Sequence, residues 1–183
     1  MKVVILDRDG VINVDSRDYI KSPDEWKPIP GSIEAISLLA NNGIKVYVAT
    51  NQAGVARGLF SSATLDAMHQ KMHQLVRAAG GEIQGVFYCP HHPKDRCYCR
   101  KPNIGLLVQI ADDFGESLSN QPFVGDSVKD IEAAKKMGCR PVLVKTGNGQ
   151  DTLQTLGGSV ECYDDLLSFA RSAIRELGSS SQP

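Results

Sequence analysis

Short apolar runs alternate along the chain with longer stretches in which apolar residues recur at helical spacing. The short runs are rich in β-branched residues and predict buried strands over 2–7, 44–49, 84–88, 122–125 and 141–145. The longer stretches predict helices over 32–42, 61–79, 104–114, 128–137 and 164–177, the first two capped by Ser32 and Ser61 and stopped by Gly43 and Gly80. This alternation is typical of an α/β fold with three layers, in which helices cover both faces of a doubly wound, mostly parallel sheet.

Two segments interrupt the alternation of strands and helices. Residues 10–31 contain three prolines and the only Trp, and they join the first strand to its helix. Residues 89–103 follow the third strand and hold most of the cysteines. Ligands of open α/β sheets bind beyond the carboxyl ends of the strands, where both segments begin. We therefore expect both to form walls of one site, in a chain that has no room for a large cap domain.

Length, composition and charge narrow the class of protein. The chain has 183 residues, of which 42% are hydrophobic and 22% charged, so we expect a single globular domain over 1–178 and a flexible tail over 179–183. The net charge of −1 lacks the basic excess of nucleic-acid-binding proteins. No apolar run is long enough for a membrane span or a signal peptide, so we expect a cytoplasmic protein without a membrane partner. Because no large apolar helix face is left over, we expect a monomer.

Polar residues suited to phosphoryl transfer stand near the ends of the predicted strands. They are, in chain order, Asp7, Asp9, Thr50, Lys101, Asp126 and Asp130. Two carboxylates two residues apart repel each other unless a cation or a proton compensates, and Mg²⁺ prefers such oxygen ligands together with phosphate. An Asp-x-Asp-Gly sequence alone also occurs in turns and in calcium loops. The whole set, however, offers a nucleophile, an acid, a hydroxyl, an amine and a metal-binding carboxylate, which transfer of a phosphoryl group to an aspartate requires.

In this order the residues resemble the four motifs of the haloacid dehalogenase superfamily of phosphatases. The resemblance implies that Asp7 attacks phosphorus and forms an aspartyl phosphate. It implies that Asp9 protonates the departing oxygen and then activates the hydrolytic water. Thr50 and Lys101 would hold the phosphoryl oxygens.

The resemblance also implies a catalytic Mg²⁺. Asp7, Asp126 and the backbone carbonyl of Asp9 would bind this ion. Asp130 would orient the surrounding groups or Lys101. For Asp130 the alternative is a solvated acid on a helix, because exposed acids are common.

A second metal site is predicted in the segment that follows the third strand. Cys89 and His91 form one pair, and Cys97 and Cys99 form another, each with one residue between the ligands. In extended backbone such residues point to the same side, so each pair offers two ligands to one ion. Four such ligands without a carboxylate favour a closed, structural Zn²⁺ site that rigidifies the loop before Lys101. His92 is the alternative to His91, and free or buried thiols are the alternative to a metal site.

The remaining cysteines and histidines carry no predicted chemistry. Cys139 and Cys162 stand beside strands and read as small buried hydrophobic residues. His69 and His73 share a helix face, but a zinc protease would need a glutamate where Gln70 stands. We expect the two histidines to form a polar helix face.

Four stretches resemble the heptose-bisphosphate phosphatases, a branch of the same superfamily: residues 7–13, 50–58, 88–93 and 97–102. The resemblance implies removal of the 7-phosphate from D-glycero-D-manno-heptose 1,7-bisphosphate. The product would be the heptose 1-phosphate, used for ADP- or GDP-heptose in lipopolysaccharide core or related glycans. The expected partner is thus a small sugar bisphosphate.

Five residues are predicted to bind this substrate. Arg100 offers a planar fork to the second phosphate. Asn51 and Gln52 can bond sugar hydroxyls. By resemblance, Asp15 and Tyr19 also line the sugar site.

Three other functions stay open at this point. Histidinol-phosphate phosphatases share the four motifs and a similar zinc loop, but the sequence of residues 54–58 resembles the heptose enzymes. A receiver-like signalling domain also has an aspartate, a threonine, a lysine and Mg²⁺, yet it needs no acid two residues after the acceptor. A zinc-stabilised binding module would lack catalysis altogether.

Overall fold

The protein, described here over residues 1–179 by a computed structural model, is built on one parallel sheet of six strands. The strands lie in the order β3-β2-β1-β4-β5-β6, and every neighbouring pair is parallel. Their bounds are β1 Val3–Leu6, β2 Lys45–Asn51, β3 Gly85–Cys89, β4 Pro122–Gly125, β5 Arg140–Val144 and β6 Glu161–Tyr163. The five predicted strands are confirmed within two residues at each end.

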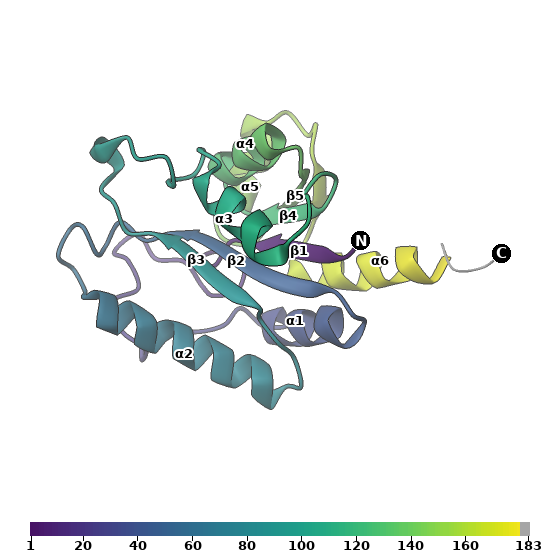
Figure 1. Cartoon of the computed structure of the whole chain (residues 1–183), viewed down its shortest axis with the longest axis horizontal. Coiled ribbons are helices and arrows are strands. Elements are labelled where there is room, and N and C mark those ends of the chain that lie inside the picture. The colour runs from purple at the N-terminus through teal and green to yellow at the C-terminus, as the bar shows by residue number, and fades with distance from the viewer. Residues whose placement is uncertain (180–183) are drawn as a thin grey trace.

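Helices connect the strands and form the outer layers (Figure 1). Their bounds are α1 Ser32–Asn41, α2 Ser62–Ala78, α3 Gly105–Phe114, α4 Val128–Met137, α5 Gly149–Thr155 and α6 Leu166–Ser179, with a 3-10 turn, η1, at Pro93–Asp95. The five predicted helices are confirmed within two residues. The short α5, η1 and β6 fall outside the predicted ranges, because periodicity needs a longer window to show.

The two predicted helix caps have different outcomes. Ser61 caps α2 by accepting a hydrogen bond from the backbone N–H of Thr64 at 3.0 Å. The prediction that Ser32 caps α1 is wrong. The capping residue is Gly31, at a φ of 83°, and the Ser32 hydroxyl instead donates to the Ile12 carbonyl at 2.6 Å. This bond ties the segment after β1 to the start of α1.

Alternate residues of the strands face two separate hydrophobic clusters. Val4 and Leu6 of β1 pack in the cluster shared with α1, α2 and α6, whereas Val3 and Ile5 pack in the cluster shared with α3 and α4. Figure 1 shows these two groups of helices on opposite sides of the sheet. Trp26 is fully buried in the first cluster and anchors the long segment after β1 to the core. This is the three-layer, doubly wound sheet that the sequence predicts.

The sheet places β1 between β2 and β4, whose connections run in opposite directions from it. At such a switch point the carboxyl ends of the strands leave a crevice for a ligand. Within the described part of the chain, the segments bordering this crevice contain turns and η1 but no cap-sized domain. The expected tail began at residue 179, but Ser179 closes α6, and the remainder, 180–183, lies outside the described residues. No helix of residues 1–179 is both long and apolar enough to cross a bilayer.

Candidate active site

A cavity opens where β1, β2 and β4 end. Its lining includes all the residues predicted for catalysis, for sugar binding or for Mg²⁺: Asp7, Asp9, Asp15, Tyr19, Thr50, Asn51, Gln52, Arg100, Lys101 and Asp126. Lys129 and Asn148, which the sequence did not single out, line it as well. The fold therefore brings the predicted residues together from segments that are far apart in the chain.

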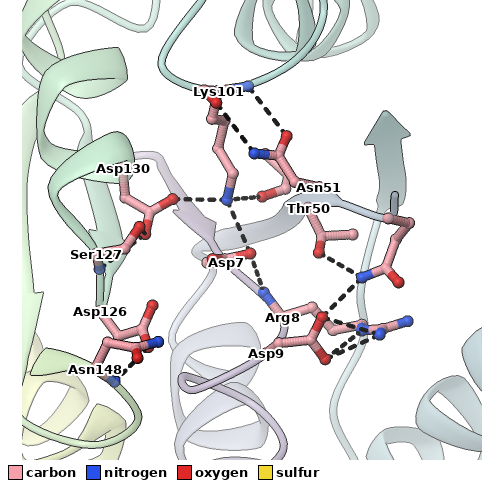
Figure 2. A network of polar contacts seen from close by, with 12 residues as sticks. Asp7, Arg8, Asp9, Thr50, Asn51, Lys101, Asp126, Ser127, Asp130 and Asn148 are labelled. Atoms are coloured by element: carbon pink, nitrogen blue, oxygen red, sulfur yellow. Dashed lines mark hydrogen bonds and ion pairs between the residues drawn. The ribbon is translucent and has the colours of Figure 1, made fainter. Parts of the chain in front are cut away.

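Lys101 is buried at the centre of the site (Figure 2). Its ammonium lies 2.8 Å from Oδ1 of Asp7 and 2.6 Å from Oδ1 of Asp130, and it donates to the Ala49 carbonyl at 2.7 Å. Burial acts to lower the pKa of Lys101, but the charges of Asp130 and Asp7 outweigh it, so the pKa is raised. The lysine is therefore a fixed positive charge at the edge of the sheet.

Asp130 is fully buried, so the solvated-acid interpretation is wrong. Its Oδ2 accepts from the hydroxyl of Ser127 at 2.6 Å and from the backbone N–H of Ser127 at 3.1 Å. Its Oδ1 faces Lys101. With both oxygens held, Asp130 fixes the position of the lysine.

Asp7 lies at the end of β1 with its carboxylate in the cavity. Its Oδ1 accepts from the backbone N–H of Arg8 at 2.7 Å and faces Lys101. Burial raises the pKa of Asp7 well above its usual value; Lys101 opposes this shift, whereas the charges of Asp130 and Asp126 add to it. One lysine does not compensate three carboxylates, so this corner has a place for another cation.

Asp126 faces Asp7 and is held by the turn after β5. The backbone N–H and the side-chain Nδ2 of Asn148 donate to its Oδ2 at 2.7 and 3.0 Å (Figure 2). Burial and the charge of Asp130 raise the pKa of Asp126 to about 6. Side-chain oxygens of Asp7, Asp126 and Asp130 lie within 4.8 Å of one another. Such a buried carboxylate set suits Mg²⁺.

Asp9 has a different environment, although it follows Asp7 by only two residues. Its Oδ1 accepts from Arg8 Nε at 3.1 Å and from Asn13 Nδ2 at 2.9 Å. Its Oδ2 accepts from Arg8 Nη2 at 3.0 Å and from Gln52 Nε2 at 2.8 Å. Burial opposes ionisation, but Arg8, Asn13 and Gln52 outweigh it and lower the pKa of Asp9. Because both oxygens are held in this way, the backbone carbonyl of Asp9 is what remains for a metal.

The end of β2 supplies groups that hold other side chains of the site. Asn51 donates from Nδ2 to the Lys101 carbonyl at 3.1 Å and accepts from the Lys101 N–H at 3.0 Å. Gln52 Nε2 donates to Asp9 and, at 2.9 Å, to the hydroxyl of Thr50. We expected both amides to bond sugar hydroxyls. Most of their polar atoms instead form hydrogen bonds with Lys101, Asp9 and Thr50. The side-chain oxygen of Gln52, Oε1, has no hydrogen-bond donor among the described residues.

The loop after β1 and the loop before α3 complete the cavity. Asn148 Nδ2 lies 3.2 Å from Oδ2 of Asp15 and so links this loop to the turn that holds Asp126. Tyr19 has a positive φ of 65°, and the guanidinium of Arg57 lies 5.9 Å from the centre of its ring. Nη1 of Arg100 is buried without a hydrogen-bond partner among the described residues, which leaves a donor for an anion.

The predicted zinc ligands come together beside this cavity. Sγ of Cys89 lies 3.5 Å from Sγ of Cys97, which lies 3.5 Å from Sγ of Cys99, and Nδ1 of His91 lies 3.2 Å from Cys99. Zn–S bonds of about 2.3 Å in a tetrahedron place sulfurs about 3.8 Å apart. The set therefore fits a closed Zn²⁺ site. His92 instead caps η1, accepting from the Lys94 N–H at 3.2 Å.

The other cysteines and histidines differ partly from expectation. Cys139 is buried, as predicted, but Cys162 is only half-buried. The polar-face interpretation is wrong for His69, which is buried with Nε2 3.2 Å from Nη1 of Arg8. His73 is half-buried.

Comparison with known proteins supports the same chemistry as the geometry of the site. The family model described as HAD-hydrolase-like matches residues 98–166. The D-glycero-β-D-manno-heptose-1,7-bisphosphate 7-phosphatase of Pseudomonas aeruginosa is 52% identical, and the alignment covers 94% of this chain and 98% of the relative.

Two solved structures of the same kind match along nearly the whole chain. The D,D-heptose 1,7-bisphosphate phosphatase of Bordetella bronchiseptica, complexed with magnesium and phosphate, superimposes with a TM-score of 0.93 at 47% identity, over 96% of this chain and 99% of that one. The corresponding protein of Burkholderia thailandensis gives a TM-score of 0.72 at 42% identity and covers all of both chains. The chain therefore belongs to the D-glycero-β-D-manno-heptose-1,7-bisphosphate 7-phosphatase family of haloacid dehalogenase-like hydrolases.

Proposed function

We propose that this chain is a Mg²⁺-dependent phosphatase that removes the 7-phosphate of D-glycero-D-manno-heptose 1,7-bisphosphate and leaves the 1-phosphate. The observation that carries the proposal is the position of Asp7, with an unbonded carboxylate oxygen in a cavity that also holds Lys101 and Asp126. The near full-length similarity to named heptose-bisphosphate phosphatases supports the substrate. Residues 1–178 would act as one domain, and the cytoplasmic location and monomeric state stay predictions.

Asp7 is the nucleophile in this mechanism. Its Oδ1 is held by Arg8 N–H and Lys101, which leaves Oδ2 without a donor among the described residues and able to attack phosphorus. A bond forms between this oxygen and phosphorus as the bond from phosphorus to the sugar oxygen breaks. Lys101 and the hydroxyl of Thr50 then hold the phosphoryl oxygens, whose charge the fixed ammonium offsets.

Asp9 acts first as the general acid and then as the general base of the reaction. The arriving phosphate brings negative charge next to Asp9, and a like charge raises the pKa of a carboxyl, so the substrate favours its protonated form. Asp9 gives this proton to the departing sugar oxygen. The resulting carboxylate then takes a proton from the water that cleaves the aspartyl phosphate, which restores both residues.

Asp7, Asp126 and the backbone carbonyl of Asp9 would hold Mg²⁺. When bound, the ion withdraws charge from the phosphoryl oxygens and keeps the neighbouring carboxylates ionised. Asn148 fixes Oδ2 of Asp126, so Oδ1 is the oxygen left for the ion. Asp130 stays outside this set, because Ser127 and Lys101 occupy its oxygens.

The rest of the cavity selects the sugar. The unpartnered Nη1 of Arg100 would bind the 1-phosphate. Asp15 and Tyr19 from the loop after β1, and the side-chain oxygen Oε1 of Gln52, would bond sugar hydroxyls. Asn51 would contribute mainly by holding the backbone of Lys101. Zn²⁺ in the cluster of Cys89, His91, Cys97 and Cys99 would stabilise the loop that carries Arg100 and Lys101.

The test is phosphate release by purified variants in the presence of Mg²⁺. We expect Asp7→Asn to lose essentially all turnover and Asp9→Asn to lose about 10²–10⁴-fold, with both proteins folded. Asp112→Asn, at an exposed position on α3, is the matched control and should keep wild-type activity. Substantial turnover by Asp7→Asn would refute the mechanism. Faster hydrolysis of histidinol phosphate than of the heptose bisphosphate would refute the substrate assignment.

A further inference from the structure

Arg8 stands between the two acidic residues of the site, yet its side chain is buried rather than open to substrate. Its Nε and Nη2 donate to both carboxylate oxygens of Asp9. Its remaining terminal nitrogen, Nη1, lies 3.2 Å from Nε2 of His69. The guanidinium thus has one partner in the site and another on α2.

The contact between Arg8 and His69 determines the protonation state and the tautomer of the histidine. A guanidinium has only hydrogen-bond donors, so Nε2 of His69 must accept. His69 is therefore the neutral imidazole with its proton on Nδ1. Burial and the neighbouring Arg8 lower the pKa of His69 to about 3, in agreement with this geometry. The ring of Tyr88 lies 5.7 Å away, centre to centre, on the β3 side.

We propose that His69 is a positioning residue for the phosphatase reaction, acting through Arg8 on Asp9. The imidazole fixes the third nitrogen of the guanidinium and therefore sets the plane in which Arg8 grips both oxygens of Asp9. Asn13 and Gln52 add one bond to each of these oxygens, so the carboxylate has a single orientation. The inference rests on the proposed role of Asp9 and extends it to a helix that does not line the cavity.

This chain of contacts predicts a particular kinetic defect. His69 touches no substrate, so its loss should leave substrate binding unchanged and slow the steps that need Asp9. We expect His69→Leu to lower kcat about tenfold, because small misplacements of a reacting group are costly, with KM within about twofold of wild type. His69→Gln places a carbonyl oxygen near the position of Nε2 and should restore kcat to within about threefold of wild type.

The matched control is His73→Leu. His73 lies one turn further along α2 and has no hydrogen bond to Arg8. It should keep wild-type kcat and KM. A loss of kcat in His73→Leu equal to that in His69→Leu would overturn the proposal, as would wild-type kcat in a folded His69→Leu or a defect confined to KM.

A spectroscopic measurement on the wild-type protein tests the protonation state of His69, on which the proposal depends. In ¹⁵N-labelled wild-type protein, one of the four histidines should show the neutral tautomer protonated on Nδ1 from pH 6 to 8, and its signal should vanish in His69→Gln. A His69 that is protonated there, or carries its proton on Nε2, would overturn the proposal. The Asp9→Asn variant distinguishes a failure of the proposed function from a failure of the role proposed for His69. An active Asp9→Asn removes the proposed function itself, whereas an inactive Asp9→Asn beside a wild-type-like His69→Leu removes only the role of His69.

Discussion

Buried charges in the site are compensated unequally. The Lys101 ammonium has three oxygen partners, and the Asp9 carboxylate accepts five hydrogen bonds from Arg8, Asn13 and Gln52. Asp7 and Asp126 lie close to each other and to Asp130, and the charge of Lys101 offsets this repulsion only in part. A carboxylate that is desolvated beside like charges favours its protonated form. Without a divalent ion, Asp7 and Asp126 therefore take up protons at a higher pH than ordinary exposed aspartates do.

This imbalance predicts that stabilisation by Mg²⁺ depends on pH. The pKa of Asp126 is raised to about 6 in the folded state, so its contribution to stability is complete below about pH 4 and is lost as the pH rises through 6. Mg²⁺ binds the ionised form and reverses that loss. We expect the ion, at about a hundred times its Kd, to raise Tm by about 5–10 °C at pH 7.5 and by less than half as much at pH 5.

Thermal unfolding with and without Mg²⁺ at the two pH values measures this effect. Comparison at constant pH cancels the other titrating groups. In Asp126→Asn the shift caused by Mg²⁺ should be small at both values. Equal Mg²⁺ shifts at pH 5 and pH 7.5 in the wild type would contradict this electrostatic account.

Single residues differ in how far the sequence can reveal them. Asp7, Asp9 and Asp126 could be predicted because each follows an apolar run that ends at the same sheet edge. Asn148 follows β5, but nothing in its sequence surroundings indicates that it bonds Asp126. The contact between Arg8 and His69 joins residues 61 positions apart, so only the packing of α2 on the sheet reveals it.

At the level of elements, the turn between β5 and α5 supports the metal ligand. Thr146 Oγ1 donates to the Gly10 carbonyl at 2.6 Å, and Asn148 holds Asp126. Between them Gly147 has a φ of 58°, and a Cβ there would overlap the Asp126 carboxylate and the backbone of Gly10. The turn therefore needs a glycine for space as well as for its conformation.

Gly147→Ala should for this reason damage metal binding. Gly157 offers a matched control, since its φ is 62° and a Cβ there would meet nothing within 4 Å. We expect each variant to lose about 1 kcal/mol of stability from the left-handed backbone. Only Gly147→Ala should also raise the Mg²⁺ concentration needed for half-maximal activity, by roughly tenfold or more. Identical Mg²⁺ titrations of the two variants would show that the turn does not position Asp126.

The Cys/His loop is the second element on which the site depends. It has few apolar side chains of its own, and it leads directly into Arg100 and Lys101. A zinc-selective chelator, with Mg²⁺ kept in excess, should lower Tm and reduce kcat by roughly a hundredfold as Lys101 loses its place. Cys99→Ser should behave likewise, whereas Cys162→Ser, outside the cluster, should not. Full activity after zinc removal, checked by metal analysis, would refute a structural role for the ion.

The longer elements could be predicted from periodicity, and the metal loop from the spacing of its four ligands. The choice of His91 over His92 followed from the i, i+2 geometry, and the structure brings His91 to the cysteines. The cap prediction for Ser32 failed because a serine before an apolar stretch is a typical cap, whereas here its hydroxyl donates a hydrogen bond to the Ile12 carbonyl. Short elements such as α5 and η1 give no periodic signal.

On the scale of the whole molecule, the order of the strands in the sheet brings the residues of the site together. The two clusters on opposite faces of the sheet hold β1, β2 and β4 side by side, so Asp7, Thr50 and Asp126 meet at one edge. Alternation of strands and helices predicts such a sheet but not the order of its strands. The order rests on long-range packing of α1, α2 and α6 against one face and of α3 and α4 against the other.

The central claim is that a carboxylate oxygen of Asp7 becomes bonded to phosphorus. A crystal structure with Mg²⁺ and beryllium fluoride, which mimics an aspartyl phosphate, tests this directly. The account predicts a beryllium–oxygen bond to Asp7, with the fluorides near Lys101 and Thr50. Beryllium fluoride bound to another residue, with the Asp7 carboxylate free, would contradict it.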